Sequence, residues 1–398
     1  MPRPSVCQGS FGRGQLAIAA LFCALGFQYA TWAARIPALK TELRLTDAEV
    51  GVLLMAAGVG ASVSFPLVAL LMRRLGSRRL SLLSLLGLTA LLLALAVAPN
   101  YPLALVVLCA DGVLVGCLNT AMNAQGAALE AAHGRNAMAR LHATFSGGSL
   151  LAALLASGVT ALTSSVLAHF AVAAALLLLL CASSRTGLLG EEEPAPGAAP
   201  GKRRGRRLAL PAGATWWMCA AMAFGTVTEG AMNDWSGLYL KEIAEAPAAL
   251  LPLGIASVSG TMLLVRLFAD RFRARWGDGR VVLYGSALAA AGLAFALMAG
   301  GVVPALTGFA CVGLGVAAVT PCVYVAAARR SPEDLALVAA MGTTGLLAGP
   351  PLLGLVAGAG SLVWVFAVVA GCAAAVSLCS VRIPWTPRAA PEPEPVTG

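Results

Sequence analysis

Charged residues are scarce in this sequence. They make up 11% of its 398 residues, whereas hydrophobic residues make up 59%. Soluble chains carry roughly 25% charged residues, and a soluble fold of this size could not cover its surface with so few. Apolar runs of about 20 residues, long enough to cross a bilayer as a helix, recur from end to end. The sequence therefore predicts an all-α polytopic membrane protein.

Motifs for enzyme chemistry are absent as well. There is no Walker loop, no spacing typical of metal ligands and no recognisable pairing of a nucleophile with histidine. The 10 cysteines form no C-x-x-C pair, and nearly all lie in apolar runs, which favours a role as small core residues. We expect no enzyme activity, no cofactor and no metal.

The apolar runs predict about 12 transmembrane helices. The expected spans are 14–36, 48–72, 79–98, 101–128, 140–162, 165–183, 212–238, 248–268, 281–299, 302–327, 337–357 and 360–380. The first run follows two arginines as a signal peptide would, but it has no clear cleavage site. We expect it to remain as the first span.

Basic residues indicate the orientation of these spans. If the N-terminus is cytoplasmic, all but four of the 27 Lys and Arg residues fall on the cytoplasmic side, with Arg266 counted among them after span eight. The four on the outer side are Arg35, Lys40, Arg44 and Lys241. We therefore expect a bacterial cytoplasmic (inner) membrane protein with both termini in the cytoplasm. Its net charge of +9 then faces anionic lipid, and nucleic acid is not an expected partner.

A polar segment interrupts the spans near the middle of the chain. Residues 184–211 combine acidic, Pro/Ala/Gly-rich and basic stretches, which is typical of a flexible linker. We expect an N-terminal six-helix bundle over 1–183, a cytoplasmic linker over 184–211, a C-terminal six-helix bundle over 212–383 and a disordered Pro-rich tail over 384–398.

The two halves resemble each other. Trp32 ends span one and Arg74 lies in an Arg-x-Gly at the end of span two, while Trp235 and Arg275 hold matching places in spans seven and eight. Two such six-helix pseudo-repeats are a transporter architecture, with the solute site between them near the middle of the bilayer.

Residues 69–79 read Ala-Leu-Leu-Met-Arg-Arg-Leu-Gly-Ser-Arg-Arg. This stretch resembles the signature that follows span two in the major facilitator superfamily, although Ala69 replaces its first glycine and Arg73 its aspartate. Other patterns resemble an uncharacterised bacterial inner-membrane branch related to fucose permease. These are Trp32-x-x-Arg35-x-Pro37, Asn123-x-x-Gly126, His142-x-x-x-Ser146, Glu229-Gly230 with Asp234-Trp235, and Gly349-Pro350-Pro351. The resemblance implies the major facilitator fold and tilts the solute toward a sugar or polyol.

Span four carries a stripe of small and polar residues. Gly112, Gly116, Asn119, Asn123 and Glu130 lie on one helix face. The stripe predicts either a packing seam between helices or a cavity wall whose amides bind solute hydroxyls. Glu130, at the cytoplasmic end beside basic residues, is more typical of a gate-related ion pair.

Charged side chains inside a span are costly unless they are paired or wetted. Asp111 in span four and Glu229 in span seven are expected to lie well inside the bilayer. Each is a candidate proton-coupling site, because a carboxyl that gains and loses a proton can favour different openings of the transporter. Each is alternatively a structural partner of a neighbouring group. Asp234 points about 140° away from Glu229 on the same helix.

Three residues share a face at the outer end of span one. Gln28 and Trp32 are candidate solute-binding residues, although Trp32 is also typical of the interfacial aromatic belt. We expect Arg35 to pair with Glu229 or Asp234 in an outer gate.

Four further candidate site residues lie in spans seven and ten and at the ends of spans two and eight. The remaining solute-binding candidates are Asn233 and Tyr324, and the remaining gating candidates are Arg74 and Arg275.

These features predict a secondary active transporter. We expect it to move a small polar solute by alternating access, coupled to H⁺ and working as a monomer in the lipid bilayer. The alternatives are a multidrug or metabolite efflux antiporter and a non-transporting membrane sensor. The efflux alternative is weakened because span five lacks the Gly-Pro motif that many antiporters of the superfamily carry, and the sensor alternative because no soluble signalling domain is attached.

Overall fold

The computed structural model describes residues 4–135, 137–190 and 213–385, and the regular secondary structure of these residues is helical. The helices are α1 (Pro4–Ala33), α2 (Ile36–Glu42), α3 (Asp47–Ala96), α4 (Tyr101–His133), α5 (Met138–Leu162), α6 (Val166–Ser184), α7 (Gly213–Glu242), η1 (Ala248–Leu250), α8 (Leu253–Trp276), α9 (Asp278–Ala299), α10 (Val302–Val316), α11 (Val319–Ala328), α12 (Pro332–Ala359) and α13 (Leu362–Arg382). The prediction of an all-α membrane fold is confirmed.

The helices match the expected spans with three differences. α3 joins spans two and three across a kink at Gly76, whose φ of 69° favours glycine. Span ten is divided into α10 and α11, and the short helix α2 lies where an outer loop was expected. Within the described residues, 10 helices are long and apolar enough to cross a membrane. α7, with its carboxyl and threonine residues, is not among them, so the count of twelve remains a prediction.

Local sequence signals set several helix ends. Thr46 and Glu49 form a capping box at the start of α3, in which each side chain bonds the backbone of the other. Asn100 and Ser331 accept hydrogen bonds from the first turns of α4 and α12, each of which also has a proline near its start. Gly134 ends α4 in the left-handed conformation.

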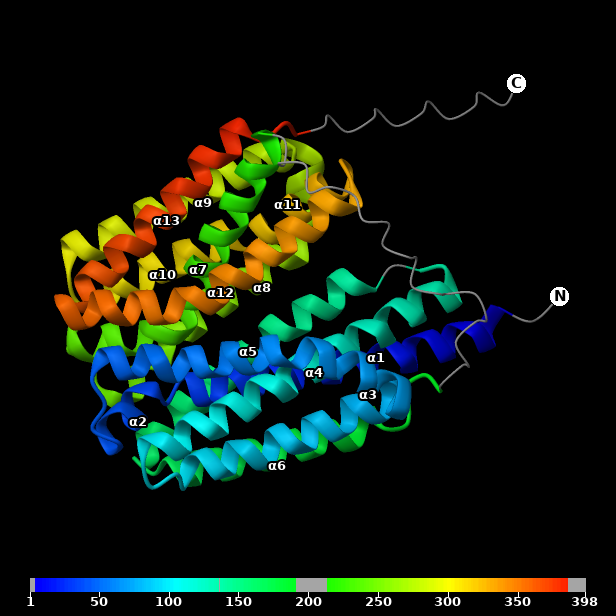
Figure 1. The fold of residues 1–398 in the computed structure, drawn as a ribbon, viewed down its shortest axis with the longest axis horizontal. Helices are drawn as coiled ribbons and strands as arrows, with labels where there is room; N and C mark the ends of the chain where they lie inside the picture. Colours follow the sequence, from blue (N-terminus) through cyan, green and yellow to red (C-terminus); the bar gives the residue numbers. More distant parts are fainter. Residues whose placement is uncertain (1–3, 136, 191–212, 386–398) are drawn as a thin grey trace.

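The helices form two bundles, α1–α6 and α7–α13, which lie side by side (Figure 1). Two helix pairs make the main contact between the bundles, α3 with α12 and α5 with α8. In the first pair a Cβ on Gly51 would lie 2.9 Å from Gly354, so these positions require small residues. The bundle contact therefore depends on close backbone approach.

α6 ends and α7 begins at the same end of the molecule (Figure 1). We call this the linker end, and the opposite end, which holds α2, the α2 end (Figure 1). Most of the predicted linker 184–211, from residue 191 on, lies outside the described residues, as does the predicted tail from residue 386. The expected domain boundaries stay a prediction.

Candidate functional site

α1 carries two neighbouring polar residues that contact different helices. Gln28 Nε2 donates a hydrogen bond to Asp111 Oδ1 of α4 at 2.7 Å, and both side chains are buried. The structure thus brings together a predicted solute-binding residue and a predicted proton-coupling residue. A buried carboxyl needs such a partner, because its desolvation is otherwise costly.

The next residue of α1, Tyr29, reaches the other bundle. Its hydroxyl donates to Asp234 Oδ1 of α7 at 2.7 Å, and Asp234 is also buried. A small pocket between α7 and α12 adjoins Asp234 and is otherwise lined largely by apolar residues. The bond between Tyr29 and Asp234 therefore joins the two bundles deep inside the protein.

Glu229 of α7 points toward a different neighbour. Its Oε1 lies 3.3 Å from Arg266 Nη2 of α8, and Arg266 Nη1 donates to Ser146 Oγ of α5. Ser146 and Arg266 belong to different bundles, so this group also spans the bundle contact. Sequence reasoning missed Arg266 by assigning it to the cytoplasmic side, although the expected span 248–268 already contained it. A basic residue inside a span was the available signal.

These groups form one cluster, which we call the central polar cluster: Gln28, Tyr29, Asp111, Ser146, Glu229, Asp234 and Arg266. Asp111 and Glu229 both lie close enough to Tyr29 to act on it electrostatically, and His142 is similarly close to Arg266. Carboxyls held between two bundles can change their charge as the bundles move. The cluster is therefore suited to proton uptake, polar-solute binding, or both.

The expected pairing of Arg35 with Glu229 or Asp234 is wrong for this structure. Arg35 is buried, and its guanidinium donates to Thr160 Oγ1 at 2.7 Å and to the Ser165 carbonyl at 2.9 Å. These acceptors lie where α5 ends and α6 begins. Arg35 thus fastens α1 to its own bundle.

Trp32, predicted as either a solute-binding or an interfacial residue, is 2% exposed and lies in the core. Its ring packs edge-on against Tyr29, with 5.3 Å between the ring centres. In the described part of the chain its indole Nε1 has no hydrogen-bond partner. Trp32 therefore supports Tyr29 from within the bundle.

The stripe on α4 divides into two parts. A Cβ on Gly112 would lie 1.8 Å from the Ala57 carbonyl of α3, so this part is a packing seam. Further along, Asn119 is exposed and Asn123 is half-buried, and Asn123 Nδ2 donates to Asn119 Oδ1 at 3.0 Å. The packing seam is thus found at the glycine segment, and solute binding by the two amides stays a prediction.

The other two predicted solute-binding residues are less distinctive. Asn233 is half-buried and donates to the Glu229 carbonyl one turn earlier. Tyr324 is half-buried in α11. The structure does not bring Tyr324 into the hydrogen bonds of the central polar cluster among the described residues.

The predicted gating residues at the linker end have mixed surroundings. Glu130 accepts hydrogen bonds from the backbone of Ala137 and Met138, so its carboxylate caps the start of α5. Arg74 and Arg275 are exposed. Sequence reasoning missed a neighbouring pair: Arg273 Nε lies 2.8 Å from Asp278 Oδ1 and bridges α8 and α9 at their junction.

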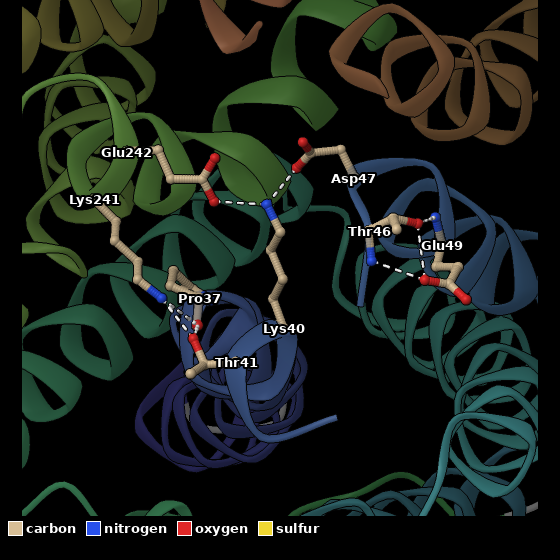
Figure 2. A network of polar contacts seen from close by, with 8 residues as sticks. All are labelled: Pro37, Lys40, Thr41, Thr46, Asp47, Glu49, Lys241 and Glu242. Atoms are coloured by element: carbon tan, nitrogen blue, oxygen red, sulfur yellow. Dashed lines mark hydrogen bonds and ion pairs between the residues drawn. The ribbon is translucent and has the colours of Figure 1, made fainter. Parts of the chain in front are cut away.

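At the α2 end, a second set of charges joins the bundles (Figure 2). Lys40 Nζ lies 2.5 Å from Asp47 of α3 and 2.6 Å from Glu242 of α7. Lys241 Nζ donates to Thr41 Oγ1 at 2.6 Å and to the Pro37 carbonyl at 3.1 Å. We call these contacts the α2 latch.

The α2 latch holds the bundles together at this end. Its two lysines were among the four basic residues assigned to the outer side, where basic residues are disfavoured. The presence of these two lysines on the disfavoured side was the sequence signal that they make specific contacts.

No group of His, Cys, Asp and Glu that could hold a metal ion occurs among residues 4–135, 137–190 and 213–385. The groups available for chemistry in the central polar cluster are therefore its carboxyls, its arginine and its hydroxyl and amide groups.

Comparisons with known proteins identify the family. The family model described as Major Facilitator Superfamily matches residues 16–336, and the chain belongs to that family of membrane transporters, which are not enzymes. An uncharacterized MFS-type transporter of Yersinia pestis is 31% identical over 359 residues, which cover 88% of this chain and 90% of the relative. Membrane protein MosC of Rhizobium meliloti is 30% identical over 356 residues, covering 86% and 83%.

Solved structures share the fold. A mutant form of the nucleoside transporter NupG has a TM-score of 0.71 at 16% identity, covering 94% of this chain and 99% of that one. FucP, a Major Facilitator Superfamily transporter in the outward conformation, has a TM-score of 0.63 at 18% identity, covering 95% and 100%. The predicted fold and family are confirmed.

Proposed function

We propose that this protein moves a small polar solute across the bacterial cytoplasmic membrane by alternating access, driven by a proton gradient. The observation that carries the proposal is the position of Asp234. It is a buried carboxyl of one bundle whose hydrogen-bond donor, Tyr29, belongs to the other. Any movement that separates the bundles at this depth must break that bond, so the charge of Asp234 and the conformation are coupled.

The arrangement of contacts along the molecule supports alternating access. Contacts between the bundles include the α2 latch at the α2 end and, at greater depth, Tyr29 with Asp234 and Ser146 with Arg266. We propose that the α2 end faces the outside, because the linker end carries most of the arginines. The conformation seen here is then the one closed to the outside.

The carboxyls of the cluster supply sites for the coupling proton. The titratable group in contact with Asp234 is Tyr29 from α1, and Glu229 lies five residues earlier on the helix of Asp234. Asp111 has a neutral partner, Gln28, rather than a cation. A proton on either aspartate removes a charge from the low-dielectric interior. The loss of this charge lowers the free-energy cost of moving the bundles relative to one another.

The solute is proposed to bind beside this cluster. Asn119 and Asn123 continue the stripe of α4 beyond its glycine seam, and their amides both donate and accept hydrogen bonds. Polar groups of this kind fix the orientation of a small solute in a cavity. FucP and NupG share the fold, and this supports a polar solute without naming it.

The test uses protein reconstituted in liposomes with a pH-sensitive dye inside. A thermal-shift screen of purified protein against sugars, polyols, nucleosides, amino acids and organic acids first selects the solutes that bind. We expect a bound solute, added outside, to acidify the liposome interior and to accumulate when the outside is made acidic.

The variants Asp234→Asn and Asp111→Asn preserve the acceptors of Tyr29 and Gln28 but cannot take up a proton. Both should lose proton movement while they still bind the solute. Glu333→Gln, an exposed position at the start of α12, is the matched control and should behave as the unmodified protein. Solute movement without any proton movement in the unmodified protein would contradict the coupling.

A further inference from the structure

Arg266 is a charged side chain well inside a membrane-spanning helix. It lies about ten residues, or roughly 15 Å, from the end of α8 at Trp276. Its guanidinium extends toward α5 and α7, where Ser146 and Glu229 contact it. A cation at this depth is costly unless a function requires it.

The pairing of Arg266 with Glu229 is weak in geometry. One nitrogen contacts one carboxylate oxygen at 3.3 Å, whereas a strong arginine–carboxylate pair has two parallel bonds at about 2.7–2.9 Å. Nη1 is taken by Ser146, and Nε has no hydrogen-bond partner among the described residues. Arg266 thus retains donors for a second carboxylate.

The pair of Arg266 and Glu229 is more accessible than the two aspartates. The side chains of Arg266 and Glu229 are 21% and 29% exposed, whereas Asp111 and Asp234 are 3% and 5% exposed and each is bonded to a protein donor. Within the central polar cluster, a solute entering between the bundles therefore meets Arg266 and Glu229 first.

We infer that the transported solute carries a carboxylate, and that Arg266 binds it in place of Glu229. This inference rests on the proposed function and names the chemical class of its solute. A neutral polyol would leave Arg266 without a counter-ion whenever Glu229 turned away or took a proton. An anionic solute supplies that counter-ion, and the planar guanidinium matches it with two parallel bonds.

The neighbouring groups fit this arrangement. Ser146 of the opposite bundle holds the guanidinium in place. A carboxylate bound to Arg266 would therefore be linked to both bundles, directly to the arginine and through it to Ser146. The other titratable groups that act on the pair are His142 of α5, close to Arg266, and Tyr29 of α1, close to Glu229; Asp234 lies on the same helix as Glu229.

The test compares acids with alcohols of the same carbon skeleton. Purified full-length protein is titrated with D-gluconate and D-glucitol, D-galactonate and D-galactitol, and glycerate and glycerol, and binding is measured by thermal shift and by calorimetry. We expect at least one acid to bind and its paired alcohol to bind at least about tenfold more weakly, because the alcohol leaves the arginine unpaired.

Variants locate the contact. Arg266→Gln should abolish binding of the acid, and Arg266→Lys, which keeps the charge but not the fork of donors, should weaken it by about tenfold. Arg266→Lys also serves if Arg266→Gln does not fold. Arg280→Gln, an exposed arginine at the start of α9, is the control and should bind as the unmodified protein.

Three binding results would each overturn the inference: no acid binds, the alcohol of a pair binds as tightly as the acid, or Arg266→Gln keeps full affinity. Proton-coupled movement of an uncharged solute would overturn it while leaving the proposed function intact. Acid binding that depends on Arg266, with no movement of the acid across liposomes, would support the site and contradict the proposed function.

Discussion

Tyr29 on α1 and Asp234 on α7 are joined by a hydrogen bond of 2.7 Å that crosses from one helical bundle to the other. Trp32 packs against the tyrosine ring, and apolar residues of α12 line much of the pocket beside the aspartate. The bond is therefore well fixed on both sides. Its strength, and so the ease of separating the bundles, depends on whether Asp234 carries a proton.

Removing the hydroxyl should favour separation of the bundles. Tyr29→Phe leaves a buried carboxyl without its donor, which costs about 2 kcal/mol or more for a charged group. We expect solute uptake to fall at least about tenfold, since 1.4 kcal/mol corresponds to a factor of ten. Tyr284→Phe, whose side chain is 66% exposed, is the control. Equal uptake in the two variants would argue against a role for this bond.

Within the α2 latch, Lys40 makes one contact inside its own bundle and one contact to the other bundle. Lys40 pairs with Asp47 of its own bundle and with Glu242 of the other. Glu242→Gln should therefore open the α2 end, whereas Asp47→Asn should have a smaller effect. The distance between spin labels attached at Arg44 and Ala248, measured in both variants, tests this. A larger change in Asp47→Asn than in Glu242→Gln would contradict the assignment.

Arg35 is expected to stabilise the bundle and not to act as a gate. Arg35→Ala removes the donors to the part-buried acceptors of Thr160 and Ser165, at a cost of about 2 kcal/mol. The melting temperature should fall by several degrees. The charge-swapped variant Arg35→Glu with Glu229→Arg should be no more stable than Arg35→Glu alone, because Arg35 and Glu229 do not pair here. Recovery of stability or uptake in the double variant would show that they pair in another conformation.

The packing seam between α3 and α4 predicts a sensitive glycine. Gly112→Ala places a Cβ 1.8 Å from the Ala57 carbonyl, and relief of this overlap requires backbone movement that costs about 3 kcal/mol. Gly158→Ala, on α5, meets nothing within 4 Å and is the matched control. Size-exclusion chromatography and melting temperature should show loss of folded protein for the first variant alone. A stable Gly112→Ala protein would mean that the helices can move apart.

Replacing Glu229 tests its role as the resident partner of Arg266. Glu229→Gln removes the charge that competes for the guanidinium, so an acid should bind at least as tightly as to the unmodified protein. Proton-driven accumulation should fall if Glu229 contributes to coupling. Isothermal calorimetry and liposome uptake measure the two effects separately. Loss of acid binding in this variant would show that Glu229 itself contacts the solute.

Sequence alone predicted the class of fold because that prediction depends on composition and local pattern. Long apolar runs with few charges can satisfy their backbone only as helices in a bilayer, and the Arg-x-Gly stretches ending at Gly76 and Gly277 marked the repeat. It also selected Asp111, Glu229 and Asp234, since a carboxyl inside an apolar run is costly wherever it points. These inferences required no knowledge of which helices are neighbours.

The partners of those residues were decided by tertiary structure. Helical periodicity gives the direction of a side chain on its own helix but not the helix it meets, so the expected pair of Arg35 and Glu229 was wrong. The packing of both bundles decided which face of α1 contacts α4 and which contacts α7. As a result, Gln28 donates a hydrogen bond to Asp111, and Tyr29 donates one to Asp234. Close approach at positions such as Gly51 and Gly354 set that packing, because only there can the backbones come near enough to bring distant polar groups together.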